Sequence, residues 1–188
     1  MELGIPLSRF ILANMSWGQP RVASFRKTIP IEYNENGVHF SGLVLVLQPL
    51  RVVSYDEEKS QLILEDHKKS QCFSKLEALQ TWAMNSLDEN QSGWLSGITV
   101  PRDHSMQPWI RQKRLSLHLS SQKDKTPFFT SPGLIQININ TIKPGDILRA
   151  VVKIKGLSLQ MENDSVWTGK SRIQHHVLQL YKVDPTSD

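Results

Sequence analysis

Apolar and polar residues alternate along several segments of the C-terminal half, and this pattern restricts the fold more than any other feature. Between residues 147 and 155 every second residue is apolar, namely Leu148, Ala150, Val152 and Ile154. Segments 113–119 and 134–140 alternate in the same way, and segment 172–183 does so with a slip near His175–His176, as a β-bulge would cause. A period of two is typical of half-buried antiparallel strands, so we expect four strands here.

The N-terminal half predicts further strands joined by polar turns. Residues 38–55 form a β-rich segment that is interrupted by Pro49, which cannot donate a hydrogen bond to a neighbouring strand. The acidic turn at 56–60 leads into the apolar run 61–64, which predicts a hairpin. Upstream, residues 21–33 predict one more strand, which a turn at 34–37 links to the long segment.

One helix is expected, at about 74–87. Ser74 and Glu77 have the spacing of a capping box, in which each side chain satisfies an exposed backbone N–H at the helix start. Apolar residues then recur at helical spacing, namely Leu76, Leu79, Ala83 and Leu87. The polar, glycine-containing residues 88–97 predict a loop.

These elements predict a mainly β fold. Six to eight strands, one helix and no alternation of strands with helices favour a small antiparallel β-barrel or sandwich. The 188 residues fit a single domain. Within it we expect an N-terminal arm at about 1–20, an insertion loop at about 88–112 and a short C-terminal tail at 184–188.

Composition argues against a membrane or secreted protein. The longest apolar stretch, 43–47, is far shorter than the roughly 20 residues that span a bilayer. The N-terminus lacks the basic region and apolar run of a signal peptide. The single cysteine, Cys72, cannot form an internal disulfide, so a reducing intracellular compartment fits best.

Signals of catalysis or of a cofactor are missing from the sequence. It contains no glycine-rich phosphate loop, no G-x-S-x-G motif and no H-E-x-x-H motif. His175 and His176 are adjacent on a predicted strand and therefore point to opposite faces, which argues against a shared metal ion. We expect Cys72 to be a small buried residue rather than a nucleophile. The sequence thus predicts neither an enzyme nor a metal or cofactor site.

The net charge of +4 is distributed unevenly. Residues 1–100 carry nine Lys and Arg against eleven Asp and Glu, a balance of −2, whereas residues 101–188 carry thirteen against seven, a balance of +6. A basic half and an isoelectric point near 9.2 suggest a polyanionic partner, most simply a nucleic acid. An ordinary solvated basic surface is the alternative.

Basic residues and aromatic residues lie close together in three parts of this half. Proteins that bind single-stranded nucleic acids use cations along the phosphates and aromatic rings against the bases. The candidates for such a site are Arg149, Lys153 and Lys155 on one strand face, then Trp167, Lys170 and Arg172, and finally Trp109, Arg111 and Arg114. The alternative is that the tryptophans belong to the core and that the basic residues form an ordinary solvated surface.

The C-terminal segment resembles a known family. It contains the run PGDILRA at 144–150, VWTGK at 166–170 and VLQL at 177–180. This order of turns and strands resembles OB-fold single-stranded-DNA-binding proteins, in particular small viral and mobile-element versions, and telomere-capping and replication OB proteins are related. The resemblance implies a five-stranded barrel whose groove binds an extended strand without catalysis or cofactor, in the nucleus or at a viral replication site.

Two hypotheses follow. The first is a single-stranded DNA-binding protein in DNA replication, repair or chromosome-end protection, with RNA left open as the strand. The second is an OB-fold interaction subunit of a telomere-capping or DNA-processing complex, which binds protein partners and has weak DNA affinity of its own. The second predicts an exposed apolar patch and unpaired edge strands.

Overall fold

The computed structural model describes residues 4–68, 71–119 and 126–184. Within them one α-helix is combined with short and long strands. The strands are β1 (Ile5–Pro6), β2 (Met15–Trp17), β3 (Arg21–Ala23), β4 (Arg26–Glu35), β5 (Val38–Ser41), β6 (Leu43–Val46), β7 (Leu50–Asp56), β8 (Gln61–Asp66), β9 (Ser105–Gln107), β10 (Ile110–Arg111), β11 (Arg114–His118), β12 (Phe128–Ser131), β13 (Ile147–Asn163) and β14 (Val166–Val183). The helix is α1 (Cys72–Trp94), and 3-10 turns occupy Leu7–Arg9, Leu12–Asn14 and Ile139–Thr141.

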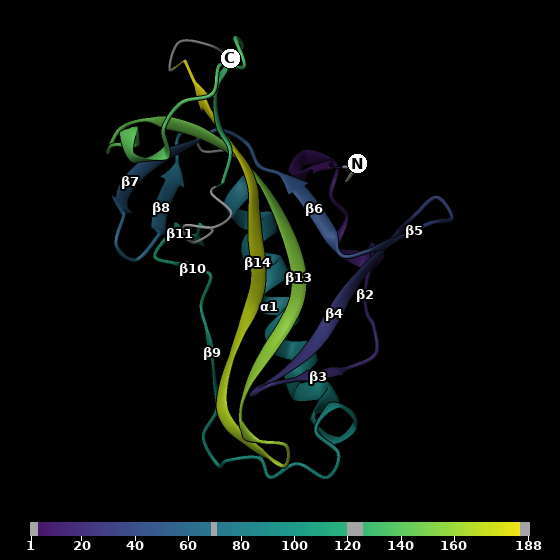
Figure 1. The fold of residues 1–188 in the computed structure, drawn as a ribbon. Helices are drawn as coiled ribbons and strands as arrows, with labels where there is room; N and C mark the ends of the chain where they lie inside the picture. The colour runs from purple at the N-terminus through teal and green to yellow at the C-terminus, as the bar shows by residue number, and fades with distance from the viewer. Residues whose placement is uncertain (1–3, 69–70, 120–125, 185–188) are drawn as a thin grey trace.

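A long hairpin formed by β13 and β14 runs through the whole molecule (Figure 1). Its strands have 17 and 18 residues. One end of β13 pairs with β6 and β7, and the other end pairs with β4. In Figure 1 the strands β7, β8, β10 and β11 lie beside the upper part of the hairpin, β3 and β4 beside its lower part, and α1 behind it. The hairpin therefore joins the two parts of the sheet.

Gly156 lies where β13 changes partners. It pairs with Pro30 of β4 on one side and with Gln174 of β14 on the other. Its φ of +155° and its close approach to the backbone of β4 leave no room for a side chain, because a Cβ atom would lie 2.9 Å from the Pro30 Cα atom. The neighbouring Lys155 is skipped in the pairing with β14, which is a β-bulge. The absent side chain and the bulge together allow β13 to cross from one part of the sheet to the other.

The predicted strand pattern is confirmed for most of the chain, but the closed antiparallel barrel is not. Strands are found at 114–118, 147–163 and 166–183, and the hairpin of β7 and β8 has its turn at 57–60. Irregular pairing on either side of His175–His176 matches the predicted slip. However, β1, β9 and β12 pair in parallel with their neighbours, so the sheet is mixed. The described part of the sheet is not closed into a barrel, because the strand order ends at β1 and β10.

The opening in the sheet lies between β11 and β14. The outer edge of β14 pairs with β9 at 170–172 and with β12 at 180–183. The stretch between them lies beside β11 without a backbone ladder. A side-chain hydrogen bond bridges the two strands there, since the His118 backbone N–H donates to His175 Nε2 at 3.1 Å. We call this opening the seam.

The helix is longer than the sequence predicts, and its start differs. It begins at Cys72, and Ser74 does not act as its N-cap but donates its hydroxyl proton to the Gln71 carbonyl oxygen at 2.8 Å. It continues through residues 88–94 because Leu87 and Trp94 pack into a second buried cluster with Ile29, Leu157, Leu159, Met161 and Trp167. Tertiary packing thus stabilises a polar segment as helix where local sequence predicts a loop.

Three further expectations are corrected. Residues 134–140 do not form a strand, because the chain folds back on β12 in a turn closed by hydrogen bonds from the Leu134 N–H to the Thr130 carbonyl and from the Thr130 N–H to the Ile135 carbonyl. The described part of the expected N-terminal arm packs on the main core, since Leu7, Phe10 and Met15 are buried there. The loop expected at 88–112 retains only its middle, because helix and the strands β9 and β10 take up the rest. Residues 185–188 of the expected tail lie outside the described residues.

The crossing at Gly156 generates a stability prediction. Gly156→Ala places a methyl group against the Ile29 carbonyl and the Pro30 backbone, so we expect the free energy of unfolding to fall by about 3 kcal/mol, as in overpacked cores. Chemical denaturation followed by circular dichroism measures it.

A matched control is Gly93→Ala. Gly93 lies in α1, and a Cβ atom there meets no atom within 4 Å, so this change should leave stability unaltered or raise it by up to about 1 kcal/mol. Equal effects of the two substitutions would contradict the assigned role of the crossing.

Candidate nucleic-acid interface

A groove of about 440 Å³ lies on the face of the sheet beside the lower half of the hairpin. Strands β4, β9, β13 and β14 all contribute to it. Its lining consists of Phe25, Arg26, Ser105, Gln107, Ser158, Gln160, Lys170, Ser171 and Arg172. We call it the cationic groove, because its charged residues are all basic.

Strand pairing explains why these polar residues meet. Arg172 pairs with Ser158 on one side and with Gln107 on the other. Gln160 pairs with Arg26, and Ser105 with Lys170. Because residues paired across neighbouring strands share one face, four strands present their polar side chains together. The opposite face carries Leu157, Leu159 and Trp167, which are fully buried.

The electrostatics of the groove favour an anion. Arg26, Lys170 and Arg172 are exposed, and no carboxylate in the described part of the chain forms a salt bridge with any of them. Partial burial, and then the neighbouring positive charge of Arg26, lower the pKa of Arg172. The two guanidinium groups therefore repel each other, and a bound phosphate would relieve that repulsion.

Phe25 gives the groove an exposed aromatic ring. It lies in the turn between β3 and β4, has a positive φ of 59° and is 70% exposed. The turn is fixed to the hairpin, because the Met161 N–H donates to the Phe25 carbonyl oxygen at 2.9 Å. A large apolar ring held in solvent beside three cations matches the stacking platform of single-strand binders.

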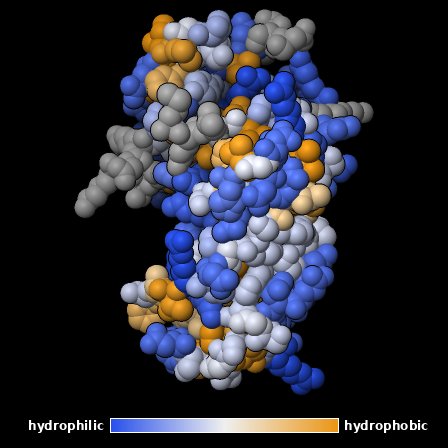
Figure 2. Space-filling model, turned by 90° about the vertical axis from the view of Figure 1, so that its right-hand side faces the viewer, coloured by the Kyte–Doolittle hydropathy of each residue, from blue (hydrophilic) through white to orange (hydrophobic). Residues whose placement is uncertain are grey.

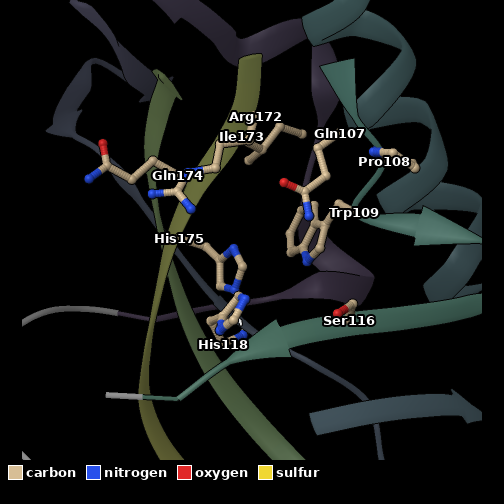
Figure 3. Close-up of a pocket in the computed structure, with 9 residues that line it drawn as sticks. All are labelled: Gln107, Pro108, Trp109, Ser116, His118, Arg172, Ile173, Gln174 and His175. Atoms are coloured by element: carbon tan, nitrogen blue, oxygen red, sulfur yellow. Dashed lines mark hydrogen bonds between the residues drawn. The ribbon is translucent and has the colours of Figure 1, made fainter. Parts of the chain in front are cut away.

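A smaller pocket of about 170 Å³ lies at the seam and shares Gln107 and Arg172 with the cationic groove (Figure 3). We call it the seam pocket, and its other lining residues are Pro108, Trp109, Ser116, His118, Ile173, Gln174 and His175. The Trp109 indole stacks on the His175 imidazole, with ring centroids 5.7 Å apart and an interplanar angle of 18°. The two sites therefore adjoin each other along β14.

The structure places the predicted cations in different surroundings. Lys170 and Arg172 line the cationic groove. Arg149 lines a separate hollow beside Tyr181 near the other end of the hairpin. Lys153 is half-buried opposite His176, and Lys155 is exposed at the bulge of β13.

The remaining predicted residues lie outside the cationic groove. Trp167 is 1% exposed and belongs to the second buried cluster, so its ring offers no free face. Trp109 is 5% exposed and lines only the seam pocket. Arg111 and Arg114 are exposed and pair with each other in the tight hairpin of β10 and β11, outside both sites.

Sequence reasoning missed Phe25 and Arg26. The sequence predicts one strand over residues 21–33. The structure has a turn at Ser24–Phe25, which local sequence does not indicate because it contains neither glycine nor proline. The sequence did contain a signal, because the segment RVASFRK at 21–27 places an aromatic residue next to cations. The C-terminal half shows the same combination of residues.

The described residues contain no group of three or more His, Cys, Asp or Glu side chains placed to hold a metal ion. Within the same residues, no helix combines the length and the apolar character needed to cross a membrane. Cys72 is buried, as expected, and burial raises the pKa of its thiol to about 11.

Comparisons with known proteins give one structural likeness. No family model matches the chain, and no curated protein matches it in sequence. A solved structure that matches is gp2.5, a single-stranded DNA binding protein encoded by bacteriophage T7. The match covers 79% of this chain and 90% of gp2.5, with 11% sequence identity and a TM-score of 0.43.

The seam predicts a pH dependence of stability. Burial lowers the pKa of His175 from 6.5 to about 4 in the folded protein. Between these values the unfolded chain binds a proton that the folded chain does not, so stability falls as the pH drops from about 6.5 to about 4. We expect this histidine to account for about 1–3 kcal/mol of that loss.

Denaturation at a series of pH values compares the wild type with His175→Gln. The variant should lose less stability over that range, whereas His39→Gln, which removes an exposed histidine, should follow the wild type. Parallel curves for wild type and His175→Gln would contradict the assignment.

Proposed function

We propose that the protein binds single-stranded DNA in the cationic groove and acts in DNA replication or repair without catalysis. The observation that carries this proposal is the meeting of Arg26, Lys170 and Arg172, without a carboxylate in the lining, beside the exposed ring of Phe25. Cations on the phosphates together with an aromatic ring on a base are the combination that single-strand binders use.

Recognition of duplex DNA fits the structure less well. Proteins that read a duplex commonly insert a helix into the major groove. Here α1 exposes the carboxylates Glu77, Asp88 and Glu89. Its one cation, Lys75, is held by the Leu7, Ser8 and Phe10 carbonyl oxygens. The helix would therefore repel a duplex.

We propose that the bound single-stranded DNA continues from the cationic groove along the hairpin of β13 and β14. Along β14, Lys170, Arg172, Gln174 and His176 alternate on one face, and His176 pairs with Lys153. Arg149 lies further along the same face of β13. It is about nine residues from Ser158, which corresponds to about 30 Å of extended strand. In this arrangement Lys153, Lys155 and Arg149 extend the site, while Arg111 and Arg114 remain outside it.

A second candidate function is a protein-docking subunit. Leu134 and Ile135 are 65% and 66% exposed, and Leu134 borders the hollow that contains Arg149. On the face shown in Figure 2, by contrast, hydrophobic residues form separate small patches within a hydrophilic surface. Chromosome-end protection and a nuclear location, or one at a viral replication site, are predictions that follow from the family resemblance alone.

Salt dependence tests the groove. Fluorescence anisotropy with a labelled single strand of ~30 nucleotides should give affinities that fall steeply with salt. In the triple variant Arg26→Ala, Lys170→Ala, Arg172→Ala, the slope of log affinity against log salt should be smaller by about 2, since each phosphate contact on a single strand contributes about 0.7. Duplex and RNA probes of the same sequence establish the preferred strand.

A matched variant removes the same charge elsewhere. Arg9, Lys59 and Lys143 are exposed and line neither the cationic groove nor the seam pocket, so their replacement by Ala should leave the slope nearly unchanged. If both triple variants lower affinity equally, general surface charge rather than the groove binds DNA. If the wild type does not bind at low salt, the docking function takes precedence.

Stacking is tested separately. Phe25→Ala should weaken single-strand binding about tenfold, because the stacking of one base is lost. The salt slope should stay unchanged, because all phosphate contacts remain. Val22→Ala, in the same hairpin and 67% exposed, is the control and should bind like the wild type. Unaltered affinity in Phe25→Ala would exclude the proposed stacking platform.

A further inference from the structure

The seam pocket contains a buried hydrogen-bond donor without an acceptor. Trp109 is 95% buried, and its indole N–H has no partner among the described residues. Figure 3 shows the indole nitrogen at the edge of the ring on the side of Ser116 and His118. Leaving such a group unpaired is costly, and buried polar groups in proteins are seldom left so.

The position of this indole is fixed from two sides. The Trp109 and Ile110 backbone N–H groups donate to Gln80 Oε1 at 2.6 and 2.9 Å. On the other side the ring lies flat on His175, whose Nε2 accepts from the His118 backbone and which also bonds to the Ile173 backbone. The imidazole is therefore committed to the protein backbone, and the indole N–H remains for a ligand.

The other polar groups of the pocket are mainly donors. Ser116 Oγ accepts a hydrogen bond from Gln61 Nε2 at 2.8 Å, so its own proton is available to a ligand. Arg172 supplies further N–H donors, and the Gln107 amide can both donate and accept. The described residues that line the pocket include no carboxylate. Such a site suits a small flat group that presents carbonyl oxygens and one N–H.

We propose, on the basis of the proposed function, that the seam pocket admits one base turned out of the bound DNA strand. The pocket selects the keto bases thymine (or uracil) and guanine over the amino bases cytosine and adenine. The strand reaches it because Gln107 and Arg172 belong to both sites. Keto bases offer carbonyl acceptors to the indole and serine donors, and their ring N–H suits the Gln107 oxygen. With the same edge turned into the pocket, an amino base would place an N–H₂ group where the keto oxygen lies and leave the donor at that position unpaired.

The test compares two strands that differ little in stacking. Oligodeoxyuridine and oligodeoxycytidine of ~20 nucleotides, at neutral to alkaline pH, differ at the 4-keto or 4-amino group and the adjacent ring nitrogen. We expect the wild type to bind the uridine strand about five- to tenfold more tightly, the effect of one or two buried hydrogen bonds. Trp109→Phe keeps an aromatic ring on His175 and should reduce this ratio to about one, with cytidine-strand affinity and salt slope unchanged.

Control substitutions test whether the ratio of uridine-strand to cytidine-strand affinity depends on the seam pocket. Trp94→Phe changes a buried tryptophan outside the seam pocket and should preserve the ratio. If Trp109→Phe does not fold, Gln107→Leu at the exposed edge strand β9 should lower the ratio instead. Equal binding of both strands by the wild type, or a ratio that survives these substitutions, overturns the proposal. If neither strand binds, the proposed function itself is overturned.

Discussion

The close packing of β13 against β4 at Gly156 is the contact on which the rest of the structure depends. It allows one strand of 17 residues to pair with β6 and β7 at one end and with β4 at the other. Because β14 follows β13 along this path, its polar face meets Arg26 of β4 and Gln107 of β9. The cationic groove exists only because these separate segments converge on one hairpin.

The same hairpin explains the seam. Among the described strands, the outer edge of β14 has partners at both ends and none between them, where it lies beside β11. A neutral histidine and a stacked tryptophan occupy the opening in place of a backbone ladder. An interrupted sheet thus gives two kinds of surface along one strand, namely the cationic groove and a donor-rich pocket.

Local sequence predicted the strands well and their assembly less well. Alternation at 147–155 identified which residues of β13 are buried, because the period of two follows directly from strand geometry. It could not show that residues 134–140, with the same pattern, fold back as a turn, since hydrogen bonds to β12 decide this. Similarly, the end of α1 depends on contacts between Trp94 and residues far away in the chain.

The site was predicted in part for the same reason. Lys170 and Arg172 were predicted because they cluster in sequence, and both line the candidate groove. Phe25 and Arg26 reach them only through the pairing of β4 with β13. Trp167 was a reasonable stacking candidate by composition, but its position opposite the polar face of β14 places it in the core. Pairing across strands, which one sequence alone does not reveal, leaves the Phe25 ring exposed and buries the Trp167 ring.

Photo-crosslinking tests the central claim most directly. A single strand carrying 5-iododeoxyuridine is irradiated in complex with the protein, and the modified peptides are mapped by mass spectrometry. Binding in the cationic groove predicts adducts at Phe25 and in the peptides that contain residues 105–109 and 170–175. Adducts confined to other surfaces, such as the exposed face of α1, would contradict the account.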